Sequence, residues 1–202
     1  MRRVMPIYLA VNSSPSMAGR LPEVGQLLDA LADELLYSPL LGERVRLCLV
    51  TFSDTARCVL PLSDLTEGFP RPPLTAGRRT LFAPVFDLLG KLIGADASAH
   101  VASGITFDRP LVVLITDGVP LDRGWQRSFD RFYQGSHPRT LLVAVGLDPA
   151  RAHELGGLLL ASDVRVLDDT ADQPLAAQVR SLLSNHLDAL TTSRMIVRPE
   201  DG

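Results

Sequence analysis

Long apolar runs, clustered charge and cysteine are all scarce in this chain of 202 residues. No run reaches the roughly 18 apolar residues of a membrane-spanning helix. The apolar run VMPIYLAV at residues 4–11 lacks a following cleavage site, so we expect neither a membrane span nor a signal peptide. The 20 basic and 23 acidic residues are scattered, which argues against the basic face of a nucleic-acid-binding protein. We therefore expect a cytoplasmic protein with no membrane or nucleic-acid partner.

The two cysteines, Cys48 and Cys58, are too few for a disulfide-stabilised scaffold. The first lies in a predicted strand, and the second lies in the strand that returns from a turn near residues 53–55. The two residues are thus predicted to lie roughly opposite each other in a hairpin. They are either two reduced core thiols or, in an oxidising environment, a disulfide.

Apolar runs alternate with amphipathic stretches along the chain, and the two patterns predict buried strands and helices respectively. The predicted strands are residues 4–11, 45–52, 57–62, 110–118, 139–147 and 163–168. The predicted helices are residues 20–37, 80–93, 123–134, 150–160 and 174–190. The predicted irregular segments are the loops 63–79 and 95–109 and a frayed tail, 191–202.

This alternation of strands and helices is typical of an α/β fold, with a mostly parallel central sheet and helices on both faces. The hairpin formed by residues 45–62 adds one antiparallel edge strand. The length suits a single domain over residues 1–202, with its core at about 4–190.

Polar residues follow two of the predicted strands at their carboxyl ends. The segment NSSPS follows the first strand and carries Ser14 and Ser16, and TDG ends the fourth strand and carries Asp117. Thr80 opens the predicted helix at residues 80–93. Ligands of open α/β sheets bind beyond the carboxyl ends of strands, where the strand order reverses. Hydroxyl and carboxylate oxygens suit a hard cation such as Mg²⁺.

These segments resemble the von Willebrand factor type A (vWA) domain and its metal-ion-dependent adhesion site. The family signature is D-x-S-x-S after the first strand, a threonine in a middle loop and the aspartate of T-D-G. Within the family, VRLCLVTFSDTARCVLPLSDL and RPLVVLITDGVP are most similar to the TerY-like proteins of bacterial tellurite-resistance and chemical-stress operons. The likeness covers roughly residues 4–190 and implies a three-layer, Rossmann-like fold with a bound Mg²⁺, Mn²⁺ or Ca²⁺.

Two departures from the family pattern touch the predicted metal site. Asn12 stands where the family has aspartate, and Arg78 and Arg79 stand where it has glycines. The first departure removes a negative charge and the second adds positive charge, so we expect weak metal binding or none. The resemblance assigns the metal site to Asn12, Ser14, Ser16, Thr80 and Asp117. The residues expected to contact a partner are Ser13, Arg78, Arg79 and Trp125.

No serine has an obvious histidine base, and no glycine-rich phosphate loop is present, so we expect no enzyme. The resemblance implies a protein-interaction module of a bacterial stress-response or conflict system, with a kinase or phosphatase encoded nearby as partner. Two alternatives stay open. One is a structural subunit with a vestigial site. The other is a metal-dependent phosphohydrolase, which would need Asp54, Asp122 or Asp148 beside Asp117 as a second carboxylate.

Overall fold

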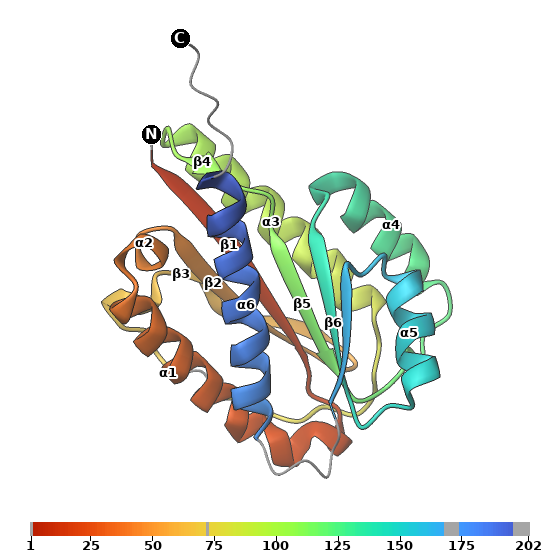
Figure 1. Cartoon of the computed structure of the whole chain (residues 1–202). Coiled ribbons are helices and arrows are strands. Elements are labelled where there is room, and N and C mark those ends of the chain that lie inside the picture. The colour runs from red at the N-terminus through yellow and green to blue at the C-terminus, as the bar shows by residue number, and fades with distance from the viewer. Residues whose placement is uncertain (1, 72, 168–173, 196–202) are drawn as a thin grey trace.

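The computed structural model describes residues 2–71, 73–167 and 174–195 and contains one seven-stranded sheet covered by helices (Figure 1). The strands are β1 (Arg3–Asn12), β2 (Val45–Phe52), β3 (Ala56–Ser63), β4 (Thr106–Phe107), β5 (Leu111–Thr116), β6 (Arg139–Val145) and β7 (Asp163–Leu167). The α-helices are α1 (Leu21–Tyr37), α2 (Pro39–Gly42), α3 (Ala83–Ala102), α4 (Trp125–Ser136), α5 (Pro149–Leu158) and α6 (Leu175–Met195). Two short 3₁₀ helices are η1 (Pro15–Arg20) and η2 (Leu65–Glu67).

The strand order is β3-β2-β1-β5-β6-β7, and β4 pairs with the start of β1. Every pair is parallel except β2–β3, which is antiparallel. The predicted α/β architecture with one antiparallel edge is confirmed. The chain builds outward from β1 to β2 and β3, then crosses back to β5 on the other side of β1. The order therefore reverses between β1 and β5, where a ligand crevice is expected.

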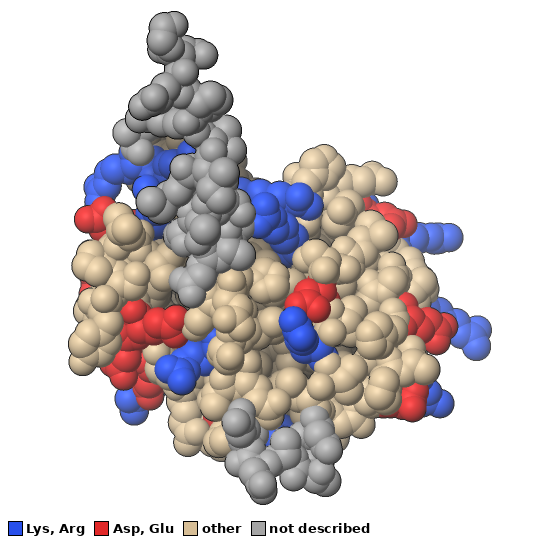
Figure 2. All heavy atoms as spheres, in the orientation of Figure 1, with Lys and Arg blue, Asp and Glu red and all other residues tan. Residues whose placement is uncertain are grey.

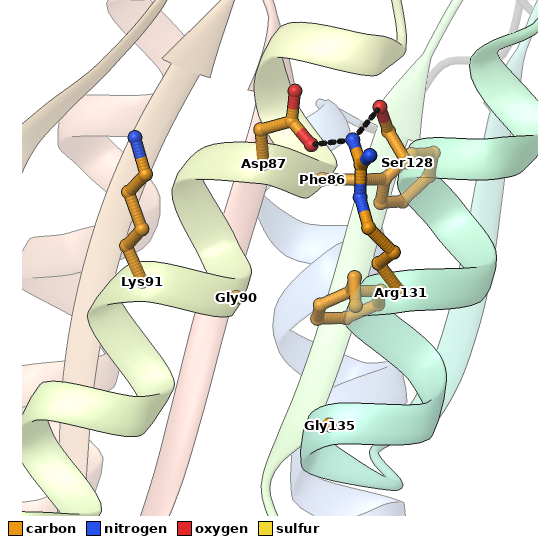
Figure 3. A pocket seen from close by; sticks show the side chains of 8 residues that line it. Phe86, Asp87, Gly90, Lys91, Ser128, Arg131 and Gly135 are labelled. Atoms are coloured by element: carbon orange, nitrogen blue, oxygen red, sulfur yellow. Dashed lines mark hydrogen bonds and ion pairs between the residues drawn. The ribbon is translucent and has the colours of Figure 1, made fainter.

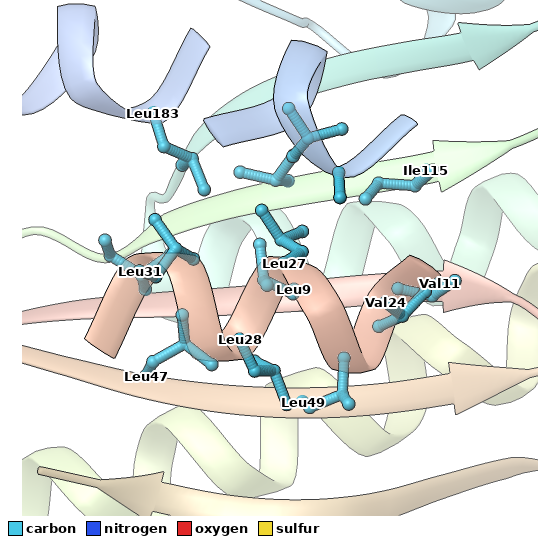
Figure 4. Packing of buried hydrophobic residues seen from close by; sticks show 14 of the residues in the cluster. Leu9, Val11, Val24, Leu27, Leu28, Leu31, Leu47, Leu49, Ile115 and Leu183 are labelled. Carbon is cyan, nitrogen blue, oxygen red and sulfur yellow. The ribbon is translucent and has the colours of Figure 1, made fainter. Parts of the chain in front are cut away.

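Alternating residues of the central strands face two apolar layers, because successive side chains of a strand point to opposite faces. The layer beneath α1, α2 and α6 includes Leu9, Leu47 and Leu49 from the sheet. Figure 4 shows α1 resting on these residues through its own apolar stripe. That stripe comprises Val24, Leu27, Leu28, Leu31 and Leu35, which recur at helical spacing and are at most 4% exposed.

The opposite layer, beneath α3, α4 and α5, is rich in aromatic rings. Phe86 on α3 contacts Phe129 and Phe132 of α4, with ring centroids 5.1 and 5.5 Å apart. Between α3 and α4 this leaves an open groove of about 480 Å³, beside Gly90 and Gly135, with Lys91 at its rim (Figure 3). These rings fix the position of α4 and thus of the chain that enters it from β5.

The predicted loop at residues 95–109 is wrong, because α3 continues to Ala102. The segment ADASAHVA is rich in alanine, which favours a helix even where few side chains are buried to make an apolar stripe. The helix ends at Ala102, and Ser103 caps it before Gly104, which has a φ of 71°. The predicted frayed tail is wrong for residues 191–195, which belong to α6, while residues 196–202 lie outside the described structure.

Charged side chains of both signs are interspersed on the face shown in Figure 2. Over the described ranges, none of the helices combines the length and the apolarity needed to cross a bilayer. β1 and β5 both end at the edge of the sheet where the strand order reverses, which is where a ligand is expected to bind.

Candidate functional site

Asn12 is the last residue of β1 and is completely buried. Its Oδ1 accepts a hydrogen bond from the backbone N–H of Ser14 at 2.8 Å. Because a backbone N–H can only donate, this contact fixes which end of the amide faces the loop. The Nδ2 therefore points across the sheet edge. There it donates to Thr80 Oγ1 at 3.2 Å and Asp117 Oδ1 at 2.9 Å.

Ser14 and Ser16 complete the same cluster. The Ser14 hydroxyl donates to Asp117 Oδ1 at 3.2 Å and lies 3.1 Å from the Ser16 hydroxyl. The structure thus brings together side chains from three segments that are far apart in sequence. We call this cluster the cup, and it consists of Asn12, Ser14, Ser16, Thr80 and Asp117.

The residues of the cup differ in their exposure to solvent. Ser14 and Thr80 are 4% and 7% exposed, whereas Asp117 is half-buried and Ser16 is exposed. A ligand would therefore meet Ser16 and Asp117 first. The deeper oxygens hold the loops together by hydrogen bonds.

Backbone hydrogen bonds lock the loops around the cup. The Gly77 N–H donates to the Ser13 carbonyl at 2.7 Å, and the Leu81 N–H donates to the Ser53 carbonyl at 2.9 Å. A Cβ on Gly77 would clash with the Ser53 side chain, so only glycine fits this approach. The Leu121 N–H donates to the Thr80 carbonyl at 2.9 Å, which ties the loop after β5 to the same site.

The sequence prediction missed the structural roles of two residues near the cup. Thr116, buried at the end of β5, accepts from Asn12 Nδ2 at 3.1 Å and donates to the Gly118 carbonyl. Asp122 accepts from the backbone N–H groups of Phe82 and Ala83 at 2.9 and 2.7 Å and so caps α3 from another loop. Thr116 directly precedes Asp117 in the sequence, so the T-D-G segment could have indicated its role. The capping of α3 by Asp122 has no such sequence pattern, because the two segments are far apart in the chain.

The arginines beside the cup lie on an exposed loop. Arg78 and Arg79 are both exposed, and the Arg78 N–H donates to Asp54 Oδ1 at 3.0 Å. This backbone hydrogen bond lowers the pKa of Asp54 below its ordinary value, and the hydroxyl of Ser53 contributes. Arg78 and Arg57 also line a polar pocket of about 190 Å³ next to the cup.

Two of the residues predicted to contact a partner are buried. Ser13 is 3% exposed, and its hydroxyl donates to the Phe52 carbonyl at 3.2 Å, so it fastens β1 to β2. Trp125 is 4% exposed and packs against Phe82 and Phe86. Both side chains are thus occupied by packing and hydrogen bonding inside the protein, and their predicted contact with a partner stays a prediction.

The donor atoms of the cup fit a divalent cation only weakly. The hydroxyls of Ser14, Ser16 and Thr80 and the carboxylate of Asp117 are hard oxygen donors, but they carry a single negative charge among them. No group of three or more His, Cys, Asp and Glu side chains able to hold a metal is found within the described ranges. Such a set suits a cation that keeps most of its own water.

No family model matches the chain, and no curated protein matches it in sequence. Its structure is similar to the pilus adhesin SpaC from Lactobacillus rhamnosus GG, with a TM-score of 0.64 and 15% identity over 93% of this chain and 30% of SpaC. It is also similar to proximal thread matrix protein 1 from the mussel byssus, solved with zinc in its MIDAS (metal-ion-dependent adhesion site) motif. That match has a TM-score of 0.61 and 16% identity over 91% of this chain and 47% of the other.

A third similar structure is a mutant of the minor pilin PilB from Streptococcus sanguinis, with a TM-score of 0.63 and 11% identity over 98% of this chain and 64% of PilB. The chain thus spans between 30% and 64% of the length of these three proteins. At such low identity the likeness concerns the fold alone. The sheet order, the antiparallel edge and these neighbours together show that this chain has the Rossmann-like fold of a von Willebrand factor type A domain.

Proposed function

We propose that this chain is a non-catalytic protein-binding module whose partner docks at the cup and on the arginines beside it. The observation that carries the proposal is the convergence of five polar side chains at the reversal point of the sheet, with Ser16 and Asp117 facing solvent. The similar adhesin and byssus matrix proteins, the second solved with zinc in its MIDAS motif, support an interaction role for the fold.

The charge beside the cup favours an acidic group on the partner. Arg57, Arg78 and Arg79 are exposed on one side of it, and guanidinium groups pair well with carboxylates. Asp117, the one carboxylate of the cup, would repel an incoming carboxylate. A cation held by Ser14, Ser16, Thr80 and Asp117 would supply positive charge there when bound.

The three carboxylates that the phosphohydrolase alternative could use beside Asp117, all within the described residues, have hydrogen-bond partners elsewhere. Asp54 accepts from Arg78 N and Ser53 Oγ, Asp122 caps α3, and Asp148 accepts from the backbone N–H groups that open α5. Each of the three carboxylates is thus engaged at a helix or loop of its own. This supports a binding role without catalysis.

The subfamily and the partner rest on the sequence likeness. We propose that the chain acts in the cytoplasm, in a bacterial stress-response or conflict system of the TerY-like kind. Its partner would then be a kinase or phosphatase encoded nearby.

A second candidate is a structural subunit of a larger assembly, and one feature favours it. Leu36, Tyr37 and Leu40, at the turn between α1 and α2, are 58%, 90% and 70% exposed. An exposed apolar group of this kind is typical of a protein interface.

Affinity capture of neighbouring gene products, with and without EDTA, tests the two candidates. If the cup binds, the double variant Arg78→Glu/Arg79→Glu lowers partner affinity by about tenfold or more. The matched charge reversal Arg127→Glu, on the exposed face of α4, leaves it unchanged. Loss of capture with Tyr37→Ser alone would favour the structural subunit. Loss of capture in EDTA would indicate a cation-bridged contact, whereas retention would indicate a direct one.

A further inference from the structure

Cys48 and Cys58 lie side by side between β2 and the edge strand β3, with their sulfur atoms 3.8 Å apart. Both thiols are free in this structure. The pairing of β2 with β3 shifts register between Leu47 and Val50, which is the part of β2 that contains Cys48. A disulfide bond is about 2.05 Å long, so the sulfurs need to approach by less than about 2 Å to bond.

The two thiols differ in access to solvent. Cys48 is completely buried in the apolar layer beneath α3, whereas Cys58 is half-buried on the outermost strand. A small oxidant from solvent therefore reaches Cys58 first. The Cys48 sulfur then lies close enough to react with the oxidised Cys58 sulfur.

The hydrogen bond between the thiols also distinguishes them. Donation from the Cys48 thiol lowers the pKa of Cys58, while the same bond and burial raise the pKa of Cys48. The negative charge of Asp96 on α3 raises the pKa of both thiols and so disfavours a thiolate at either sulfur. Asp96 Oδ2 also accepts a hydrogen bond from the buried Tyr8 hydroxyl at 2.7 Å. Cys58 is accordingly the more nucleophilic sulfur of the pair.

We propose that Cys58 and Cys48 form an oxidation site, at which a hydroperoxide converts the two thiols into a disulfide that links β2 to β3. The Cys58 thiolate attacks the peroxide O–O bond, forms a sulfenic acid and releases hydroxide, or an alkoxide for an organic peroxide. The Cys48 sulfur then attacks the Cys58 sulfur and expels hydroxide, which takes up the Cys48 proton as water. The thiols lose two electrons and two protons in total, and hydrogen peroxide is reduced to two molecules of water.

The site is separate from the cup, and it acts on a hairpin that borders it. Residues 53–55 join β2 to β3, and the Ser53 carbonyl accepts from Leu81 next to Thr80. A covalent link would stiffen this hairpin and protect the edge strand from opening. The inference does not depend on the proposed partner.

Hydrogen peroxide titration of the full chain, followed by alkylation and tryptic mass mapping, tests the proposal. Arg57 lies between the two cysteines, so trypsin separates them and a disulfide appears as a pair of linked peptides. Wild-type protein should lose both thiols together, yield that linked pair and regain both thiols with dithiothreitol. Cys48→Ser should instead accumulate a sulfenic acid at Cys58 that dimedone captures.

The variant Cys58→Ser is the matched control. Its buried Cys48 should react about tenfold more slowly than Cys58 does in Cys48→Ser, because burial keeps it a thiol and out of reach. The proposal is overturned if Cys58 of the wild-type protein accumulates as an oxidised acid while Cys48 remains a free thiol that an alkylating agent modifies after unfolding. It is also overturned if neither thiol reacts with peroxide. The wild-type result decides the question even if a variant fails to fold.

Discussion

The side-chain nitrogen of Asn12 lies 2.9 Å from Oδ1 of Asp117, and the same amide is held from behind by the N–H of Ser14. An aspartate at position 12 would place a second carboxylate oxygen against Asp117. Like charges at that distance repel unless a cation lies between them. Asn12 therefore joins the two strand ends without a cation, through a neutral donor.

The variant Asn12→Asp should make the stability of the domain depend on divalent cations. In EDTA we expect it to lower the free energy of unfolding by about 2 kcal/mol, because it replaces a hydrogen bond with charge repulsion. Millimolar Mg²⁺ should recover much of that loss, while the melting temperature of the wild type should change little. Calorimetric melting with and without Mg²⁺ measures both effects.

The double variant Asn12→Asp/Asp117→Asn is the matched control. It exchanges the amide and the carboxylate and leaves one negative charge at the site. Its Mg²⁺ dependence should fall back toward that of the wild type. An equal response to Mg²⁺ in all three proteins would show that Asn12 and Asp117 do not control cation binding.

Replacing Gly77 by alanine should loosen the loop beside the cup. The new Cβ would collide with the Ser53 side chain, and the backbone would have to move away from Ser13. We expect a loss of about 1–3 kcal/mol in unfolding free energy, measured by urea denaturation. Gly25→Ala, on α1, meets open space and should instead stabilise by about 1 kcal/mol. Equal behaviour of the two variants would contradict the packing of this loop.

Truncating Trp125 should damage the core. Its ring lies 5.5 Å from that of Phe82, so Trp125→Ala should cost about 3–5 kcal/mol of unfolding free energy. Leu121→Ala, at a side chain that is 66% exposed nearby, should change it by no more than about 0.5 kcal/mol. Because Trp125 is the only tryptophan, the native fluorescence should show a buried, poorly quenched indole. Rapid quenching by iodide would place it at the surface.

The sequence predicted the sheet well because buried parallel strands leave long apolar runs, such as those of β1 and β5. The sequence also predicted that Asn12, Thr80 and Asp117 lie at one edge of the sheet. The polar residues at the ends of strands and loops can be recognised from short segments of sequence. The sequence did not reveal that the side chains of Ser13 and Trp125 are buried, because burial next to a site depends on packing between distant elements. The direction of the Asn12 amide depends on Ser14 and Asp117 together, so a single pattern does not encode it.

Removing the cap on α3 should destabilise the domain locally. Asp122 accepts two N–H groups at the start of this helix, so Asp122→Ala should cost about 1–2 kcal/mol of unfolding free energy. Hydrogen exchange should show faster exchange at Phe82 and Ala83. Asp130→Ala, at an exposed position of α4, should leave both measurements unchanged. No change in exchange at Phe82 would contradict the cap.

The pKa of Asp54 should respond to its backbone donor. Because folding lowers this pKa, the stabilisation is present above the ordinary aspartate range and is lost as pH falls through the folded-state value. Arg78→Pro removes the N–H donor and should raise the pKa, as measured by carboxyl NMR titration. Arg78→Ala keeps the N–H and should raise it less. The reverse order would show that the guanidinium charge dominates.

The free edge of the outer strand β3 offers few evenly spaced hydrogen-bond donors to an added strand. Pro61 lacks an N–H, and the register shifts opposite β2 disturb the regular spacing of the remaining donors. An extended peptide therefore has no even ladder of hydrogen bonds to join on this side. Recognition by strand addition is therefore disfavoured at this edge of the sheet.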